Sequence, residues 1–262
     1  MREGRLSYNT IVVKDAGTIR TISLNRPERR NAMTAEMQIE LISALEETAA
    51  GRCRALVLAG SGDAFCSGLD LSALSEARGA QEYRADAERS ARLFLALYEM
   101  PIPTIAAVHG PAIAGGAGLA ILCDFTLATA DARFGFTEVR VGFVPALVSI
   151  FLSMQIGDKR SRDLLLSGRI FSVEEAFRLG LVNEVFPREE LNVRVEELAQ
   201  TLIKNSPEAL SETKRLITAR QRAWLDVAVA NAIDASVEAR DTHDFREGTS
   251  AFLEKRTPVW TK

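Results

Sequence analysis

The chain has 262 residues, of which 47% are hydrophobic and 26% charged, the composition of a globular protein. Its net charge is −3 and its pI is near 5.6, which argues against a nucleic-acid-binding protein, since such proteins usually carry a basic face. The three cysteines lie far apart with no histidine at ligand spacing, which argues against a disulfide framework or a zinc site. We find no apolar run of about 18 residues and no signal-peptide core. We therefore expect a cytoplasmic protein with no membrane contact.

The first half of the chain alternates predicted strands and helices. Short β-branched or apolar runs predict four strands, at residues 9–14, 18–24, 54–59 and 103–108. The first two flank a turn signal and predict a hairpin, and the last two are typical of strands buried on both faces. Helices are predicted after the capping residue Thr34 and over residues 81–98. This alternation predicts an α/β core with mostly parallel strands.

The second half of the chain is predominantly helical by pattern. Strand signals nearly vanish after about residue 127. Ser172 and Glu175 form a capping box, and Gly180 can close that helix. Further helices are predicted at residues 190–202, 207–220, 224–240 and 245–255. We therefore divide the chain into an α/β core, residues 1–195, and a C-terminal helical region, residues 196–262, that packs on the core and on a neighbouring subunit.

The stretch AVHGPAIAGGAGLAILCD, residues 107–124, interrupts an apolar run with glycines. We interpret it as the end of a buried strand, a loop at residues 110–116 and a helix at residues 117–123. The start of a helix leaves backbone N–H groups without partners at the positive end of the helix dipole. Glycine lets a ligand approach them closely. The stretch suits an anion, or an oxygen that becomes negative during a reaction. A tight turn without a ligand is the alternative.

A second stretch, GSGDAFCSGLDLSAL at residues 60–74, also follows a predicted buried strand and contains Gly68. Neither stretch completes a P-loop, a dinucleotide-binding fingerprint or a nucleophile elbow. The carboxyl ends of parallel strands meet at one crevice, where ligands bind. Two backbone N–H donors that converge there from separate loops would form an oxyanion hole.

Six segments in sequence order carry a family resemblance. They are LNRPERRNAM (24–33), AFCSGLDL (64–71), AVHGPAIAGGAGLAILCDFTLAT (107–129), RFGFTEVRVGFVP (133–145), SGRIFSVEEAFRLGLVNEV (167–185) and AFLEKRTP (251–258). Together they resemble the crotonase superfamily, the enoyl-CoA hydratase/isomerase family. The resemblance spans nearly the whole chain. It implies an α/β fold with a crotonase-like (ClpP/crotonase) core of repeated ββα units, a C-terminal helical trimerisation region, and a homotrimer or a hexamer built as a dimer of trimers.

The resemblance also implies site residues. The N–H groups of Leu69 and Gly115 would hold the thioester oxygen as it gains charge in an enolate-like transition state. Removing one such donor typically costs about 3 kcal/mol of transition-state stabilisation. Coenzyme A is expected only as part of the thioester substrate, with no permanently bound cofactor and no metal.

The coenzyme A part of the substrate is expected to contact Arg26, Arg29, Ala64, Leu69 and Lys255, which occupy the matching positions of the family segments. Cationic side chains are suited to its phosphates. Solvated surface charge is the alternative for Arg29 and Lys255.

Family hydratases usually carry two catalytic glutamates, and this chain keeps one of them. The second falls at Glu138, in an apolar stretch where burial should favour the neutral carboxyl and raise its pKa. An ion pair with Arg140 is the alternative. The first falls at Gly118, which has no side chain. One carboxylate can still move a proton between two carbons, which is the isomerisation of an enoyl-CoA, or support hydration with a water held by another group.

We therefore expect an acyl-CoA enzyme that hydrates or isomerises an enoyl-CoA with Glu138 as its acid/base. The alternative is a catalytically weak CoA-thioester-binding protein that lacks the first glutamate. A serine peptidase on the related fold is disfavoured because no serine–histidine pair is placed for it. Asp70 is expected to cap a helix, His109 to orient backbone, and His243 to be solvated.

Overall fold

The structure is a computed structural model that describes residues 8–74 and 79–260. A six-stranded sheet forms its centre, in the order β1-β2-β3-β4-β6-β9. The strands are β1 (Ile11–Ala16), β2 (Ile19–Leu24), β3 (Ala55–Gly60), β4 (Thr104–Val108), β6 (Phe125–Thr129) and β9 (Glu184–Phe186). Only β1 runs antiparallel to its neighbour, so the predicted hairpin and the predicted parallel core are both confirmed.

A second, three-stranded sheet lies beside the first, in the order β5-β7-β8. Its strands are β5 (Pro111–Ile113), β7 (Arg133–Gly135) and β8 (Ile170–Ser172). The expectation that strands end near residue 127 was wrong, because β7, β8 and β9 all follow it. Each has only three residues, too few for an alternating pattern to stand out from the sequence.

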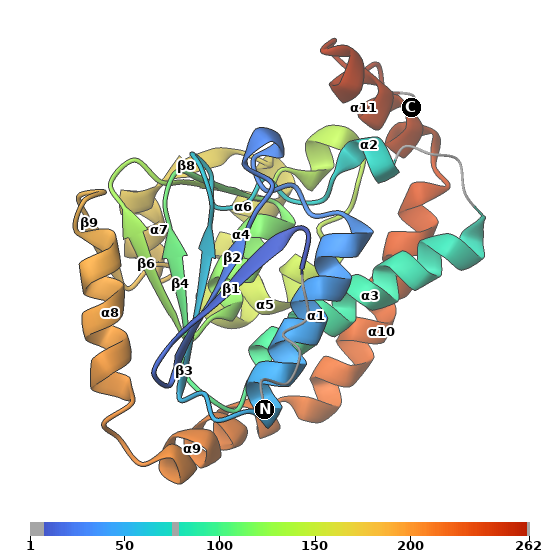
Figure 1. Ribbon diagram of the computed structural model, residues 1–262. Helices are drawn as coiled ribbons and strands as arrows, with labels where there is room; N and C mark the ends of the chain where they lie inside the picture. Colours follow the sequence, from blue (N-terminus) through green and yellow to red (C-terminus); the bar gives the residue numbers. More distant parts are fainter. Residues whose placement is uncertain (1–7, 75–78, 261–262) are drawn as a thin grey trace.

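Helices cover both faces of the central sheet (Figure 1). They are α1 (Ala35–Ala50), α2 (Leu71–Leu74), α3 (Ala80–Tyr98), α4 (Gly115–Leu122), α5 (Ala146–Ile156), α6 (Asp158–Ser167), α7 (Val173–Leu179), α8 (Leu191–Leu202), α9 (Pro207–Ala219), α10 (Arg222–Arg240) and α11 (His243–Glu254), with short 3-10 turns η1 (Pro27–Arg29) and η2 (Glu138–Val141). α8 packs on one face through a small apolar cluster. The main core fills the other face, under α1, α3, α4 and α5.

Side-chain caps begin the helices where the sequence predicts them. The hydroxyl of Thr34 accepts a hydrogen bond from the N–H of Met37, and Ser172 caps α7 in the same way. Gly180 closes α7 in the left-handed conformation. Ser206 caps α9 ahead of a proline at the first helical position.

The glycine-rich stretch differs from its prediction in its first residues. α4 begins at Gly115 and not at residue 117, and residues 111–113 form strand β5 instead of loop. Ala114 joins them with φ of 51° and ψ of −126°, a strained conformation for a residue with a side chain. The strand and the helix therefore meet at one residue, and the helix start is held at a fixed place.

Candidate active site

Two loops, one after β3 and one after β5, pack directly on each other. The N–H of Ile113 donates to the carbonyl of Cys66 over 2.9 Å. Gly68 has φ of +92°, and a Cβ placed there would lie 2.9 Å from the Cβ of Ala114 and 3.6 Å from the nitrogen of Gly115. Only glycine fits this approach, so Gly68 brings the residue after it close to the start of α4.

The N–H groups of Leu69 and Gly115 are left available by this packing. Neighbouring backbone groups are engaged, since Met33 donates to Gly68 and Asp70 donates to Met33. Within residues 8–74 and 79–260, neither the N–H of Leu69 nor that of Gly115 donates a hydrogen bond. Gly115 is also the first residue of α4, where the helix dipole is positive. The pair can therefore stabilise an oxygen that becomes negative.

Glu138 opens the 3-10 turn η2 and is buried, with 9% of its surface exposed. Burial raises the pKa of its carboxyl from an ordinary 4.5 to about 7. Its Oε2 has no hydrogen-bond partner in the described part of the chain. Arg140 is exposed and is not among the groups that act on the Glu138 carboxyl, so the alternative of an ion pair between them is wrong. A carboxyl with this pKa can both accept and donate a proton near neutral pH.

One cavity of about 540 Å³ brings the three groups together. Leu69, Gly115 and Glu138 all line it. Most of the remaining wall is apolar, from side chains such as Leu93, Phe143 and Val148. Helices α3 and α5 contribute part of this wall, through residues such as Phe94 and Leu147. An acyl chain can occupy such a cavity with its polar end at the two N–H groups.

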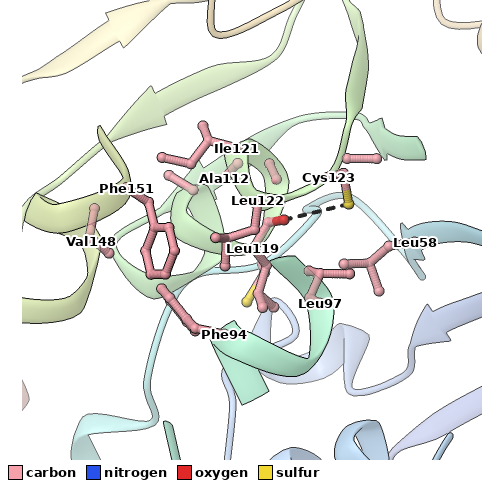
Figure 2. Close-up of a cluster of buried hydrophobic side chains, with 14 of the residues drawn as sticks. Leu58, Phe94, Leu97, Ala112, Leu119, Ile121, Leu122, Cys123, Val148 and Phe151 are labelled. Carbon is pink, nitrogen blue, oxygen red and sulfur yellow. Dashed lines mark hydrogen bonds between the residues drawn. The ribbon is translucent and has the colours of Figure 1, made fainter. Parts of the chain in front are cut away.

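The position of the missing glutamate is filled by apolar side chains. Gly118 is buried in α4, and a Cβ there would lie 2.8 Å from Cζ of Phe94 and 3.0 Å from Cγ2 of Val148. Figure 2 shows Phe94, Phe151 and Val148 gathered against α4. The rings of Phe94 and Phe151 are 6.2 Å apart. Any side chain at this position would displace them, so the cavity has an apolar wall where a second carboxyl would stand.

The residues expected at coenzyme A lie at the surface or just below it. Arg26 forms an ion pair with Asp70 over 3.1 Å, and the carbonyl of buried Ala64 accepts from the side-chain amide of Asn31. Arg29 is exposed in η1, and Lys255 is exposed at the end of α11. Of the expected contacts, only Leu69 lines the cavity.

Two of the arginines that line the cavity are neighbours of expected contacts, although neither was predicted to be one. They are Arg30 and Arg256, each adjacent in sequence to an expected contact. Each belongs to a basic cluster of the sequence, residues 26–30 or residues 255–256. The local turn decides which member of a cluster faces the cavity. Here Arg30 and Lys255 both adopt positive φ, which the sequence pattern did not indicate.

Other reactive side chains have structural partners. Asp70 precedes α2 and accepts from the N–H and hydroxyl of Ser72, as expected for a cap. Burial opposes ionisation of Asp70, but the hydrogen bonds from Ser72 and Arg26 lower its pKa. Burial raises the pKa of the Cys66 thiol to about 12, so it is not a nucleophile. His109 contacts the carbonyl of Gly62 at 2.9 Å, which agrees with a role in orienting backbone.

Among the described residues, no group of three or more His, Cys, Asp or Glu could hold a metal ion. None of the described helices is long and apolar enough to cross a bilayer.

Comparison with known proteins gives one family. The family model described as enoyl-CoA hydratase/isomerase matches residues 14–262. A Thermus thermophilus protein named "Putative enoyl-CoA hydratase" is 42% identical over 95% of this chain and 99% of its own. A Rhodobacter capsulatus protein named "Probable enoyl-CoA hydratase" is 36% identical over 98% of this chain and 99% of its own.

Solved structures agree with the sequence comparison. An enoyl-CoA hydratase/isomerase from Xanthobacter autotrophicus has a TM-score of 0.87 and 30% identity, over 95% of this chain and 98% of its own. One from Pseudoalteromonas atlantica has a TM-score of 0.87 and 29% identity, over 97% of this chain and 100% of its own. The predicted crotonase-like fold is confirmed.

Proposed function

Because the chain belongs to the enoyl-CoA hydratase/isomerase family, we propose that Glu138 is its acid/base and that the N–H groups of Leu69 and Gly115 form its oxyanion hole. The observation that carries the proposal is their arrangement around one cavity, with two available donors and one buried carboxyl of raised pKa. As a family member, the protein is an enzyme that acts on enoyl-CoA thioesters, as a hydratase or an isomerase.

The proposed step moves one proton and leaves every atom in the substrate. The carboxylate of Glu138 removes a proton from the α-carbon of a 3-enoyl-CoA. The electron pair moves onto the thioester oxygen, where the N–H groups of Leu69 and Gly115 stabilise the negative charge. The carboxyl of Glu138 then returns the proton to the γ-carbon, and the double bond ends between the α- and β-carbons. Glu138 ends in the form in which it began.

Isomerisation is the reaction that the single carboxyl favours. In hydration by two carboxyls, one activates the water and the other transfers a proton at the α-carbon. In this chain Phe94 fills the space beside Gly118, where the first of these carboxyls would stand. The names of the relatives favour hydration as a second candidate. In that case another group would hold the water, and Glu138 would still transfer its proton.

Coenzyme A is proposed to lie across the two basic clusters. Arg26, Arg29, Ala64 and Lys255 remain the proposed contacts, with Leu69 at the thioester end of the pantetheine chain. Arg26 already pairs with Asp70, so its backbone is better placed than its guanidinium for this role. Exposed Arg29 and Lys255 are available to the phosphates.

We further propose a homotrimer or a dimer of trimers, located in the cytoplasm, with residues 196–262 as the region that joins subunits. Large apolar side chains on α9 and α10 support this assembly, because at least half of the surface of each is exposed. They are Leu216 at 58%, Ile217 at 64%, Trp224 at 50% and Val227 at 62%. Sedimentation equilibrium measures it, and a monomer at micromolar concentration would contradict it.

The test of the proposed function is turnover of a 3-enoyl-CoA and of crotonyl-CoA by the wild type and by Glu138→Gln. We expect double-bond migration to exceed hydration in the wild type. We expect Glu138→Gln to lower kcat by about 10³-fold, within the range of general acid–base catalysis. Glu196→Gln, an exposed carboxyl on α8, is the matched control and should leave kcat unchanged.

Unchanged turnover in Glu138→Gln would contradict the assignment of the acid/base. Binding of both thioesters without turnover of either would favour the alternative, a catalytically weak CoA-thioester-binding protein.

A further inference from the structure

A buried arginine, Arg240, ends helix α10 beside the cavity, and the proposed reaction does not use it. Only 3% of its surface is exposed. Its guanidinium donates to the carboxylate of Asp86 on α3 over 3.0 Å. Taking two charges out of water costs about as much free energy as their attraction returns, so a buried ion pair is weak evidence of a purely stabilising role.

Asp86 has a second cationic partner on its own helix. Arg89, which follows it by three residues on α3, pairs with the same carboxylate. Asp86 would therefore keep a cationic partner even without Arg240. The need for an arginine at the end of α10 is better explained by the other groups that Arg240 contacts.

The guanidinium of Arg240 lies over two aromatic rings. It is 5.5 Å from the ring centre of Tyr83 on α3 and 5.7 Å from that of Phe143, both within the range of a cation–π interaction. The ring of Phe143 also packs against Phe245 of α11, with the ring centres 5.3 Å apart. Phe143 is thus held in the cavity wall by side chains from two helices, α10 and α11.

Phe143 is joined by a hydrogen bond to the turn that carries Glu138. Its N–H donates to the carbonyl of Glu138 over 3.0 Å. Between the two residues lies η2, which Gly142 closes with φ of 66°. A continuous series of contacts therefore runs from Asp86 through Arg240 and Phe143 to the main chain of Glu138.

We propose that Arg240 is a positioning residue, which holds Phe143 and thereby sets the place of the Glu138 carboxyl relative to the two N–H donors. The inference rests on the proposed function. Arg240 does not act through its charge, since among the described residues burial, and no neighbouring cation, raises the pKa of Glu138. A displacement of about 1 Å can cost about a hundredfold in rate, so a small shift of η2 is enough to slow the reaction.

The experiment measures turnover of a 3-enoyl-CoA by the wild type, Arg240→Lys, Phe143→Leu and the double variant. Lysine keeps the charge but loses the planar group that stacks on the rings. We expect each single variant to lower kcat by about tenfold. For Arg240→Lys, the dissociation constant of a saturated acyl-CoA should stay within about twofold of the wild-type value. Because both residues act on one turn, the double variant should also lose about tenfold, whereas independent effects would multiply to about a hundredfold.

Arg89→Lys is the matched control, because Arg89 pairs with the same carboxylate and, in the part of the chain that the structure describes, lies over neither ring. It should keep the wild-type kcat, and circular dichroism checks the folding of every variant. Phe143→Leu leaves the ion pair between Arg240 and Asp86 in place, so it tests the proposal even if Arg240→Lys does not fold.

Wild-type kcat in Arg240→Lys or in Phe143→Leu would overturn the inference. Effects that multiply in the double variant would do the same, since Arg240 would then act independently of Phe143. An equal loss of kcat in Arg89→Lys would assign the effect to the ion pairs of Asp86, and weaker binding with unchanged kcat would make Arg240 a ligand contact; either result would also overturn it. Failure of the wild type to turn over the thioester would instead contradict the proposed function itself.

Discussion

Glu138 combines deep burial with a proposed role that requires it to ionise. Its side chain is held by η2 against the apolar wall of the cavity, and burial rather than a neighbouring charge raises its pKa to about 7. A surface glutamate, with a pKa near 4.5, would be a weak base at neutral pH and a poor proton donor. The apolar surroundings therefore bring this carboxyl to the range in which one residue can perform both transfers.

The first prediction concerns the pH dependence of turnover. The proposed reaction begins with the carboxylate form of Glu138, so kcat/KM for a 3-enoyl-CoA should rise with pH and level off above about 7. Initial rates between pH 5 and 9 measure this profile. A profile already level at pH 5.5 would mean that the base has an ordinary carboxyl pKa and is a different residue.

The second prediction concerns stability. Because the pKa of Glu138 is higher in the folded state than its ordinary 4.5, the folded protein binds more protons between about pH 4.5 and 7. The contribution of this group to stability is therefore full below that range and is lost as pH rises through it. Glu138→Gln does not ionise, so its free energy of unfolding relative to the wild type should increase with pH, by up to about 3 kcal/mol. Urea unfolding at pH 5 and pH 8 measures the difference, and a difference that does not change with pH would contradict this account.

At the scale of elements, α4 joins the segment after β5 to the core. Gly115 at its start offers an N–H to the cavity, and Gly118 one turn later is pressed against Phe94 of α3 and Val148 of α5. Two rings, Phe94 and Phe151, fill the space beside the helix (Figure 2). The same packing that positions the donor also excludes a second carboxyl.

The third prediction tests that packing. Gly118→Ala places a Cβ 2.8 Å from the ring of Phe94, so we expect it to lower the free energy of unfolding by about 1–3 kcal/mol. Gly79→Ala is the matched control, since a Cβ at that position meets nothing within 4 Å. Phe94→Leu combined with Gly118→Ala should recover part of the loss. Equal stability of the two single variants would show that the space beside α4 is not filled as described.

Elements with a strong local signal were predictable from the sequence. A few neighbouring residues were enough to predict the helix caps Thr34 and Ser172 and the left-handed Gly180. The same holds for the buried strands β3 and β4. The three-residue strands were not predictable, since their pairing is decided by partners distant in sequence, such as Arg133 with Ser172. Strand β5 was interpreted as loop for the same reason.

At the scale of the molecule, the last helix closes over the site. α11 packs on η2 and on α2, and its contact with η2 depends on two glycines. A Cβ at Gly248 would lie 2.4 Å from the carbonyl of Val141, and one at Gly142 would lie 2.2 Å from the carbonyl of Asp244. Phe252 and Arg256 follow on the same segment and line the cavity. The C-terminal region therefore packs on the 3-10 turn that begins at Glu138 and lines the same cavity.

The fourth prediction concerns this closure. Gly248→Ala should push α11 away from η2 and admit water to Glu138, so kcat should fall and the midpoint of the pH profile should move below 7. The six-stranded sheet and its core do not include α11, so the far-ultraviolet circular dichroism should be retained. Ser250→Ala on the same helix is the control. A Gly248→Ala enzyme with wild-type kcat and an unchanged pH profile would show that α11 does not control this burial.

The site residues that lie in short sequence motifs were predictable. Leu69, Gly115 and Glu138 were selected from sequence, and the structure brings all three to one cavity, while their roles stay predictions. Arg240 carried no signal, because it is one charged residue on an amphipathic helix. Its place beside Phe143 follows only from how α10 packs on α3 and α5.

We propose that the N–H groups of Leu69 and Gly115 hold the substrate carbonyl beside Glu138. A crystal structure with a saturated acyl-CoA, which can be neither hydrated nor isomerised, tests it most directly. We expect the thioester oxygen at about 3 Å from both nitrogens, with the α-carbon facing the carboxyl of Glu138. An ordered thioester whose oxygen lies beyond hydrogen-bond reach of both nitrogens would contradict it.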